Sequence, residues 1–439
     1  MAHADRLERT LPDLKPPYTP GQAAAEANRC LYCHDAPCVA ACPTGIDIPG
    51  FIRKIATDNL KGSARTILSA NLLGYSCARV CPVEVLCAGA CVHQHQGHET
   101  IAIGRLQRHA IEAAFDRGDA ATLLRRRPAN GKKVACVGAG PASLACAGYL
   151  ALEGVAVTVF EKRALPGGLN TTGVAPYKMH VEGALREVEL VRDLGVTIRT
   201  GVEIGRTVTP AQLLAEHDAV FLGVGLGADA KLGIAGEDGP GVSGATAWIE
   251  RLKNEPGFAL GDLLCAVVVG GGNTAIDAAR ELANLGVPDV TIAYRRTEAD
   301  MSGYAHELAH AREEGVRLVE RAVPQSFVRG ADGTLAAVLL ADGRRLDADL
   351  VLVAIGQAKP DASVLAGFDG VARDPKGGIA ADPETGRTGN PRVYAGGDGT
   401  GVGELVVTAV QDGKRAARAI CAQLGIELAP DAPVMAGHR

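Results

Sequence analysis

Two runs of closely spaced cysteines constrain this chain more than any other feature. Eight of its twelve cysteines lie between positions 30 and 91. The first run, CLYCHDAPCVAACP, supplies Cys30, Cys33, Cys38 and Cys42 followed by Pro43, and the second, CARVCPVEVLCAGAC, supplies Cys77, Cys81, Cys87 and Cys91. Close spacing that ends in Cys-Pro is typical of 4Fe–4S sites, where the cysteine before the proline binds the other cluster of a pair. The two runs are therefore expected to interleave around two clusters.

Disulfides and structural zinc are the alternative explanations. Disulfides require an oxidising compartment, but the N-terminal residues MAHADRLERT contain no apolar core that could act as a secretion signal. Zinc would suit the Cys-x-x-Cys of Cys30 and Cys33, yet zinc sites usually pair two such knuckles. The later gaps here are four, three, three, five and three residues. The spacing favours iron–sulfur clusters over zinc, and a cytoplasmic protein is expected.

The composition argues against two classes of partner. The net charge is −5 at pH 7, so the chain lacks the basic footprint of a nucleic-acid-binding protein. No apolar run approaches the roughly 20 residues of a membrane span, so no membrane contact is expected. Glycine is frequent, with 55 residues against 7 Phe and 1 Trp, which is typical of chains that approach dinucleotides with their backbone.

The first 128 residues are expected to form an α-helical domain that binds the two clusters. Residues 48–60 and 62–73 carry apolar residues at helical spacing, and no strand-like stretch precedes residue 125. The stretch 125–133 is charged, contains proline and glycine and has no apolar period, which is typical of a solvated linker.

After the linker, the sequence KVACVGAGPASLACAGYLALEGVAVTVFEK predicts a strand, a glycine turn, a helix and a second strand. Gly138 would make the tight turn, and Gly140 would let the backbone approach a pyrophosphate at the start of the helix. Glu161 ends the second strand, where an acidic residue binds ribose hydroxyls. This pattern predicts the first part of an FAD-binding domain, residues 129–230. Its expected site residues are Gly138, Gly140, Pro141, Ala142, Ser143, Glu161, Lys162, Gly168 and Leu169.

A second unit of the same kind, AVVVGGGNTAIDAARELANLGVPDVTIAYRR, is expected to bind NAD(P)H as an inserted domain, residues 231–347. Its second strand ends in Tyr294, Arg295 and Arg296 rather than in an acid. Arginine there can bind a 2′-phosphate, which favours NADPH over NADH. The alternatives are that the arginines only solvate the strand end, or that Tyr294 stacks on the adenine. The expected site residues are Gly270, Gly271, Gly272, Asn273, Thr274, Arg295 and Arg296.

The last part of the chain, residues 348–439, is expected to return to the FAD-binding domain. Strand DLVLVAIG (349–356) leads to RVYAGGDGTG (392–401) and to a helix that begins near Thr408. Asp398 would bond the ribityl or phosphate groups, and the positive helix end would favour an anionic reduced flavin. The expected residues are Gly356, Gly397, Asp398 and Thr408. The predicted fold class is α/β, with two nested Rossmann-like domains of the disulfide-reductase type after the helical domain. Cys136 and Cys146 are expected to be small buried residues, not a redox dithiol.

The chain resembles, over essentially its whole length, the family of glutamate synthase small subunits and dihydropyrimidine dehydrogenases, and most of all the flavin subunit of the latter. The resemblance rests on RCLYCHDAPC, CPTGIDIPGFIRKIATDN, CARVCPVEVLC, IGRLQ, GGLNTT, ELVRDLGV and the AGGDGTG–DGKRAA end. It implies that one cluster takes Cys30, Cys33, Cys38 and Cys91, and that the other takes Cys42, Cys81, Cys87 and Gln107. Cys77 is then unligated, although spacing alone does not choose between Gln107 and Cys77. His93, His95 and His98 are expected in a solvated loop.

The resemblance also implies a function. NAD(P)H would give a hydride to FAD, and electrons would pass singly through two 4Fe–4S clusters to an FMN- and iron–sulfur-containing catalytic subunit that reduces uracil or thymine. The assembly would be a heterotetramer or a larger hetero-oligomer. No catalytic acid or base is expected, because hydride transfer needs none. The alternatives are the small subunit of glutamate synthase, a ferredoxin-coupled NAD(P)H oxidoreductase, and a non-catalytic subunit whose nicotinamide site is idle.

Overall fold

A computed structural model describes residues 6–401 and 405–428 of the chain. The contacts within it divide the chain into two compact units, each assembled from distant parts of the sequence. The larger unit comprises residues 15–170 and 182–226 and the described chain from Lys359 onward. The smaller unit comprises the described chain up to Leu14, residues 171–181 and residues 227–358.

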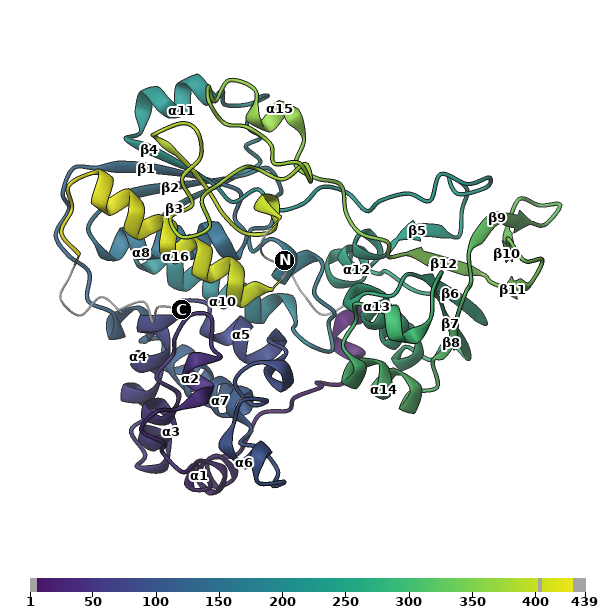
Figure 1. Ribbon diagram of the computed structural model, residues 1–439, viewed down its shortest axis with the longest axis horizontal. Helices are drawn as coiled ribbons and strands as arrows, with labels where there is room; N and C mark the ends of the chain where they lie inside the picture. The colour runs from purple at the N-terminus through teal and green to yellow at the C-terminus, as the bar shows by residue number, and fades with distance from the viewer. Residues whose placement is uncertain (1–5, 402–404, 429–439) are drawn as a thin grey trace. The chain divides into compact units, whose positions relative to one another are not determined.

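A five-stranded parallel sheet forms the centre of the larger unit (Figure 1). Its strands, in the order β13–β4–β1–β2–β3, are β13 (Val393–Ala395), β4 (Ala219–Leu222), β1 (Lys133–Val137), β2 (Ala156–Glu161) and β3 (Thr197–Thr200). Successive side chains of a strand point to opposite faces. Val134 and Cys136 therefore pack against helices α8 (Pro141–Leu152) and α16 (Val406–Gln423), while Ala135 and Val137 join a second core on the other face.

The cysteine-rich region of the larger unit is helical, as predicted. Its elements, and the other helices of the unit, are α1 (Pro20–Asn28), α2 (Pro37–Ala40), α3 (Ile48–Ala56), α4 (Leu60–Ala70), α5 (Gly74–Val80), η2 (Val83–Val85), α6 (Val92–His95), α7 (Ile103–Arg117), η3 (Ala120–Leu123), α9 (Leu169–Thr172), α10 (Val181–Asp193), α11 (Pro210–Glu216), α15 (Ala362–Leu365) and η5 (Asp398–Thr400). Leu72 and Leu73 belong to the same apolar core as α8 and α16. The helical region thus shares its core with the first sheet and does not stand alone.

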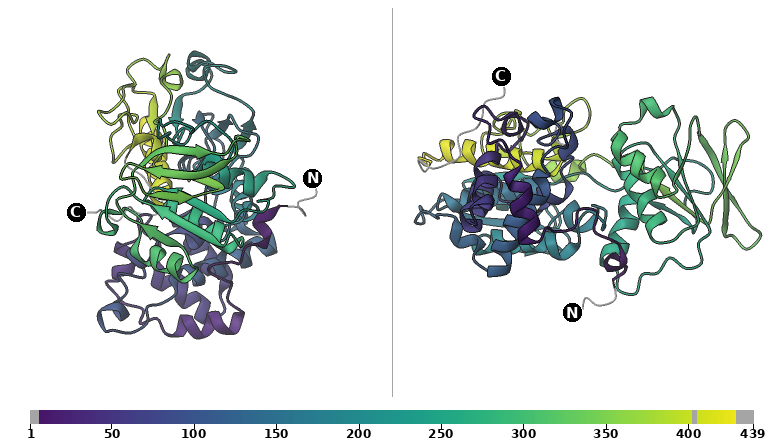
Figure 2. Two further views of the ribbon diagram at one scale, coloured as in Figure 1. Left: turned by 90° about the vertical axis from the view of Figure 1, so that its right-hand side faces the viewer. Right: turned by 90° about the horizontal axis from the view of Figure 1, so that it is seen from below.

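The smaller unit repeats the order of four of the five strands of the first sheet; its outer strand precedes the other four in the chain, whereas β13 follows them. Its parallel strands, in the order β5–β12–β6–β7–β8, are β5 (Val242–Gly244), β12 (Leu350–Val353), β6 (Cys265–Val269), β7 (Asp289–Ala293) and β8 (Arg317–Val319). These strands run side by side in the left-hand view of Figure 2. An antiparallel sheet is added by β9 (Pro324–Arg329), β10 (Leu335–Leu340) and β11 (Arg345–Asp347). The helices are η1 (Leu7–Thr10), α12 (Ala245–Asn254), α13 (Asn273–Asn284), η4 (Glu298–Asp300) and α14 (Ala305–Glu313). In neither unit is a described helix long and apolar enough to cross a membrane.

The structure confirms the α/β fold class but corrects two expected boundaries. The strand within 349–356 does not return to the first sheet, because β12 pairs with β5 and β6 of the second sheet, and the chain returns only at Lys359. The described chain up to Leu14 does not join the helical region either. Leu11 packs with Tyr177 and Trp248 in the core of the smaller unit. Both differences depend on pairing and packing partners far away in the sequence.

Candidate functional site

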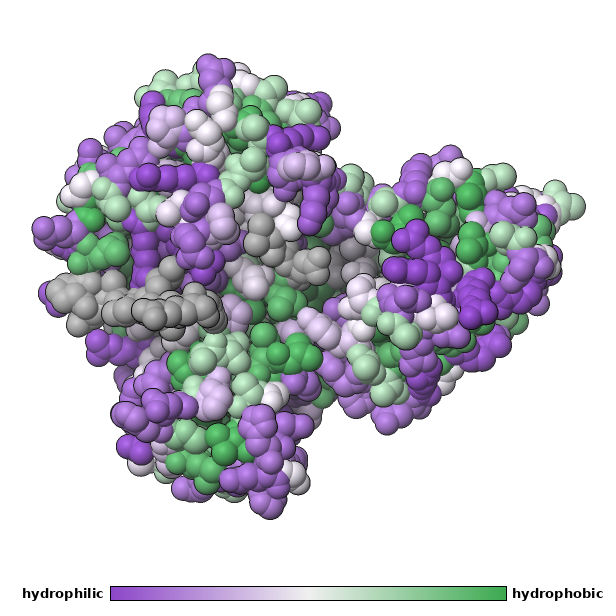
Figure 3. All heavy atoms as spheres, viewed as in Figure 1, coloured by the Kyte–Doolittle hydropathy of each residue, from purple (hydrophilic) through white to green (hydrophobic). Residues whose placement is uncertain are grey.

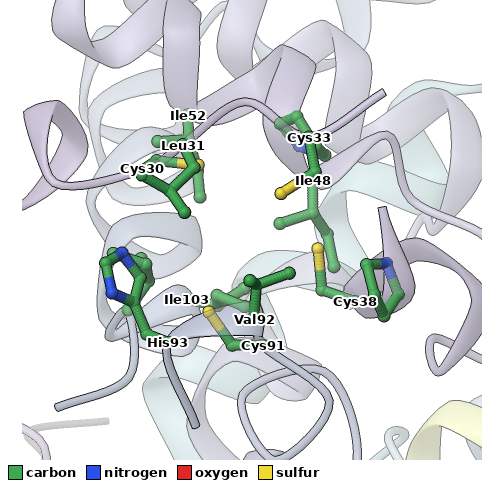
Figure 4. A pocket seen from close by; sticks show the side chains of 13 residues that line it. Cys30, Leu31, Cys33, Cys38, Ile48, Ile52, Cys91, Val92, His93 and Ile103 are labelled. Atoms are coloured by element: carbon green, nitrogen blue, oxygen red, sulfur yellow. The ribbon is translucent and has the colours of Figure 1, made fainter. Parts of the chain in front are cut away.

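The first cysteine run and Cys91 surround a cavity with an open volume of ≈ 380 Å³. Figure 4 shows the sulfur atoms of Cys30, Cys33, Cys38 and Cys91 around its open centre. Cys38 lies in α2, and Cys91 directly precedes α6. The rest of the wall is largely apolar, with Ile48, Ile52, Ile101 and Ile103 among its residues. The structure therefore brings together the four cysteines that the resemblance implied for one cluster.

His93 differs from the expectation of a solvated histidine loop. It is half-buried and lines the first cavity (Figure 4), and its Nε2 lies 3.1 Å from the carbonyl oxygen of Arg29. His95 and His98 are exposed, as predicted. The short helix α6 explains the difference, because it places His93 two residues after Cys91 on the side that faces the cavity.

A second cavity of ≈ 380 Å³ is lined by Cys42, Cys81, Cys87, Gln107 and Cys77. Gln107 lies in α7, and its Nε2 donates to the Gly74 carbonyl at 2.6 Å, which leaves the amide oxygen as the end that a metal could use. The Sγ of Cys77 accepts a hydrogen bond of 3.2 Å from Asn71 Nδ2. Both residues reach the cavity, so their positions alone do not choose between an amide and a fourth thiolate.

The chemistry of the two cavities fits iron–sulfur clusters. Among the described residues, no group of three or more His, Cys, Asp or Glu side chains has the arrangement of a single-ion site. Burial raises the pKa of Cys38 and of Cys87 to about 12. A metal compensates for this cost, because a coordinating thiol is deprotonated by the charge of the metal. Ile48 and Ile103 line both cavities, so the two sites are direct neighbours.

The glycine turn after β1 has the geometry of a dinucleotide cradle. Gly138 has a φ of +86°, and a Cβ there would lie 2.5 Å from the carbonyl oxygen of Gly223. Gly140 precedes α8 without a side-chain cap, so the amides of the first turn remain for an anionic ligand. Gly168 lies against this turn and has a φ of +59°, and a Cβ on it would lie 2.7 Å from Gly140 Cα.

The other predicted flavin residues take different places around this turn. Glu161 is buried and accepts the backbone N–H groups of Ala139 at 2.7 Å and Arg163 at 2.8 Å, so it also fixes the turn itself. Ser143 is fully buried, and its hydroxyl donates to the Val137 carbonyl, which makes it a packing residue. Pro141 and Ala142 form the first turn of α8, and Lys162 and Leu169 are exposed.

The C-terminal part of the chain adds a second loop at the start of α8. A Cβ on Gly397 would lie 3.0 Å from the Cβ of Ala142 and 3.7 Å from that of Ala409, so this glycine lies between the first turns of α8 and α16. Asp398 follows it in η5. Thr408 lies in the first turn of α16, where its hydroxyl donates to the Leu405 carbonyl. Gly356 is not in this group, since it follows β12 in the smaller unit.

The smaller unit builds an equivalent cradle. Gly270 has a φ of +152°, and a Cβ on this residue would lie 2.3 Å from the carbonyl oxygen of Ala354, so a side chain is excluded. The contact corresponds to that of Gly138 with Gly223 in the larger unit. Gly272 precedes α13 without a side-chain cap. Asn273 accepts the N–H of Tyr304 at 2.9 Å, and Thr274 is exposed at the helix start.

The end of β7 separates the roles of Tyr294 and its two arginines. Tyr294 is buried against the glycine turn, where a Cβ on Gly271 would lie 2.4 Å from its ring, and its hydroxyl donates to the Asp300 carbonyl at 2.8 Å. This arrangement disfavours stacking of Tyr294 on an adenine. Arg295 and Arg296 are exposed, and the Arg296 guanidinium lies 5.7 Å from the centre of the Tyr294 ring.

Four polar residues near the second cavity were not predicted from the sequence: Thr44, Asn71, Glu187 and Lys414. Thr44 Oγ1 lies 3.4 Å from Cys42 Sγ. Glu187 accepts the backbone N–H groups of Tyr75 at 2.8 Å and Ser76 at 3.0 Å at the start of α5. The partners of Glu187 and Lys414 are more than a hundred residues away, so no local motif marks these two residues. Thr44 and Asn71 have nearby sulfur partners, Cys42 and Cys77. The sequence signal that could have indicated Lys414 is helical spacing. Lys414 follows the cavity residue Val407 by seven positions in α16, so the two residues lie on the same face of the helix.

Comparisons with known proteins divide the chain into an iron–sulfur part and a nucleotide-binding part. A family model described as dihydropyrimidine dehydrogenase domain II, 4Fe–4S cluster, matches residues 7–119, and one described as pyridine nucleotide-disulphide oxidoreductase matches residues 132–413. The chain is 36% identical over 413 residues to the NAD-dependent dihydropyrimidine dehydrogenase subunit PreT of Escherichia coli O157:H7, covering 93% of this chain and 96% of that one. It is 34% identical over 437 residues to the glutamate synthase [NADPH] small chain of Escherichia coli K12, covering 92% of each chain.

A solved structure agrees with the fold. FprA of Mycobacterium tuberculosis in complex with NADPH has a TM-score of 0.54 at 21% identity, covering 70% of this chain and 88% of that one. At this identity the likeness concerns the fold alone. Relatives of both enzyme types match over nearly their whole length, so the comparisons identify the kind of protein without separating the two.

Proposed function

Since this chain belongs to the pyridine nucleotide-disulphide oxidoreductases with an N-terminal iron–sulfur domain, we propose that it is the electron-input subunit of a dihydropyrimidine dehydrogenase. It is a flavin- and 4Fe–4S-containing, NAD(P)H-dependent oxidoreductase of the electron-transfer type. When bound, FAD would supply the acceptor for a hydride from NAD(P)H, and the 4Fe–4S clusters would supply one-electron carriers. The residues of the chain bind and orient these groups and supply no catalytic acid or base.

The observation that carries the proposal is the pair of neighbouring thiol-lined cavities beside the flavin-type fold. Cys30, Cys33, Cys38 and Cys91 are the proposed ligands in the first cavity. Cys42, Cys81, Cys87 and Gln107 are those in the second. Val407 of α16 also lines the second cavity, whereas residues of the first cavity come only from the helical region. This supports an electron path from the flavin side to the second cavity and then to the first.

An electron path through the helical region needs an acceptor subunit. Leu31 lines the first cavity and Val85 belongs to η2 beside the second, and each is 54% exposed. Hydrophobic patches also lie over the helices of this region on the face drawn in Figure 3. Exposed apolar residues near an electron exit suit a protein partner. The proposed partner is the FMN- and iron–sulfur-containing subunit that reduces uracil or thymine.

The nucleotide is proposed to be NADPH. Arg295 and Arg296 are exposed at the end of β7, where a 2′-phosphate would be bound, and no acid occupies that position. The relatives do not decide which nucleotide is bound, because one is NAD-dependent and the other is an NADPH enzyme.

The small subunit of glutamate synthase is the second candidate, favoured by the 34% identity over 92% of that chain. Purification of the native complex separates the two proposals. We expect the complex to contain FMN and to oxidise NAD(P)H when uracil is added. Oxidation that depends instead on 2-oxoglutarate plus glutamine would identify the second candidate and refute the first. Oxidation with an artificial acceptor is the control that the nicotinamide site is active.

A further inference from the structure

Lys414 is a buried cation beside the second cavity. It lies in α16 and is 2% exposed, and its Nζ donates to the carbonyl oxygens of Thr44 at 3.0 Å and Ala70 at 2.9 Å. Ala70 is the last residue of α4, where the negative end of the helix dipole favours a cation. Val407, two turns earlier on the same face of α16, lines the cavity.

No carboxylate in the described chain pairs with this ammonium group. Two other shielded cations of the described chain, Lys178 and Arg280, show the contrast. Lys178 lies 2.8 Å from both Asp277 and Glu307, and Arg280 is paired with Glu307 and Glu314. A buried charge without a partner is costly. The charge of Lys414 is therefore expected to be matched by a group that is not a carboxylate.

The surroundings of Lys414 point to the thiolates of the second cavity. Thr44, whose carbonyl binds the ammonium, lies two residues after Cys42 and places its hydroxyl 3.4 Å from the Cys42 sulfur. Asn71 Nδ2 lies 3.4 Å from the same hydroxyl. Burial and Arg418 lower the pKa of Lys414 to about 8, and the charge of Cys42 opposes them. One polar shell thus connects the ammonium group to a proposed cluster ligand.

We propose that Lys414 is the counter-charge of the cluster in the second cavity and holds the reduction potential of that cluster above the value it would have without the cation. This inference rests on the proposed function. A cluster with thiolate ligands is anionic, and reduction adds one more negative charge. A fixed positive charge in a buried setting stabilises the reduced form more than the oxidised form. Lys414 acts through the field at the cluster, so it is a positioning residue and not a ligand.

The rival explanation is that Lys414 only caps α4 and joins it to α16. Lys253 offers a matched control for that role. It is also fully buried in a helix, and its Nζ donates to the carbonyl oxygens of Val174 at 2.7 Å and Met179 at 2.9 Å. It belongs to the smaller unit, which contains neither cavity. Its loss should affect stability without affecting a cluster.

The test is a spectroelectrochemical titration of the anaerobically prepared full chain as wild type, K414M, K414Q, K414R and K253M. For K414M and K414Q we expect one cluster to lose about tenfold in its ratio of reduced to oxidised form at a fixed ambient potential. Such a change is ~59 mV for a one-electron couple. The other cluster should be unchanged, and K414R and K253M should titrate like wild type. The shifted cluster should be the one whose spectrum changes in Q107C.

Iron and sulfide are measured on every sample first, so that a failure of the proposed function can be distinguished from a failure of the inference about Lys414. Wild-type protein that binds no iron refutes the proposed function before any potential is read. If K414M and K414Q hold both clusters with wild-type potentials, or shift no more than K253M, Lys414 is only a helix cap. If the cluster potential in K414R is as low as in K414Q, the positive charge does not set the potential, and Lys414 is again only a helix cap. If both neutral variants lose one cluster while K414R and K253M keep two, the cation is required for that cluster, as the inference expects.

Discussion

Glu187 is the residue whose removal should most clearly test how the helical region is held to the first sheet. It lies in α10, is 1% exposed, and accepts the N–H groups of Tyr75 and Ser76 and the hydroxyl of Ser76. These donors form the start of α5, which carries Cys77 and ends at Val80, directly before Cys81. A helix begins with N–H groups that have no partner inside the helix, so a side chain must satisfy them when they are buried.

The magnitude follows from the three donors that lose their acceptor. Each buried donor left unsatisfied costs about 1–3 kcal/mol, and neighbouring losses do not add fully. We expect Glu187→Ala to reduce the free energy of unfolding of the larger unit by about 3–5 kcal/mol. Glu187→Gln keeps one acceptor oxygen and should lose about 1–3 kcal/mol.

The effect should depend on pH. Burial raises the pKa of Glu187 to about 8, although the hydrogen bonds from Ser76 and Tyr75 oppose the rise. The unfolded chain releases this proton near pH 4.3, a roughly typical value for glutamate. The contribution of the protonated group to stability is therefore complete below about pH 4 and is lost as pH rises through 8. The stability difference between wild type and Glu187→Gln should change by about 5 kcal/mol across this window.

The assay is urea unfolding of the cluster-loaded full chain, followed by circular dichroism and by the visible absorbance of the clusters, at pH 5, 6.5 and 8. Glu189 in the same helix is the matched control, because its side chain is 57% exposed and pairs only with Arg192 at 2.5 Å in the described structure. Glu189→Ala should change the stability by less than ~0.5 kcal/mol. Equal losses for the two alanine variants would refute the reasoning, and a pH-independent difference would refute the titration of Glu187.

Four further outcomes are expected. Chemical analysis of anaerobically prepared protein should find close to eight iron, eight sulfide and one FAD per chain, and zinc in place of iron would contradict the two-cluster proposal. Gln107→Ala should damage one cluster while Cys77→Ser leaves both, and the opposite result in iron content and spectra would reverse the ligand proposal. Replacing Arg295 and Arg296 by Ala should lower kcat/KM for NADPH by roughly 10- to 100-fold more than for NADH, since a charge-assisted contact contributes about 1.5–3 kcal/mol; an equal loss for both nucleotides would contradict a phosphate clamp. Gly168→Ala should weaken FAD binding because its Cβ would lie 2.7 Å from Gly140 Cα, and an unchanged flavin content after dialysis would show that the loop adapts.

Local sequence determined the features that depend on backbone geometry. The positive φ and close backbone approach at Gly138 and Gly270 exclude a side chain, so the glycine fingerprints located both dinucleotide cradles. The Cys-Pro ending of the first run indicated that Cys42 would separate from its neighbours, and it lies in the second cavity. Such signals are readable because the residue type and its conformation are linked within a few positions.

Only the tertiary structure decided which distant residues meet. Strand β12 is apolar enough for either parallel sheet, and its pairing with β5 and β6 came from the fold. The resemblance had already implied Cys91 as a ligand of the first cluster, but only the fold places His93 at the first cavity. In the sequence, Glu187 and Lys414 look like any charged residue of a helix. Only the fold places the backbone N–H groups of α5 beside Glu187 and the last carbonyl group of α4 beside Lys414. Burial and hydrogen bonding between segments more than a hundred residues apart leave no periodic pattern in the sequence. The local pattern around each residue indicates only the helix or strand to which it belongs, and not the distant backbone group that it will bind.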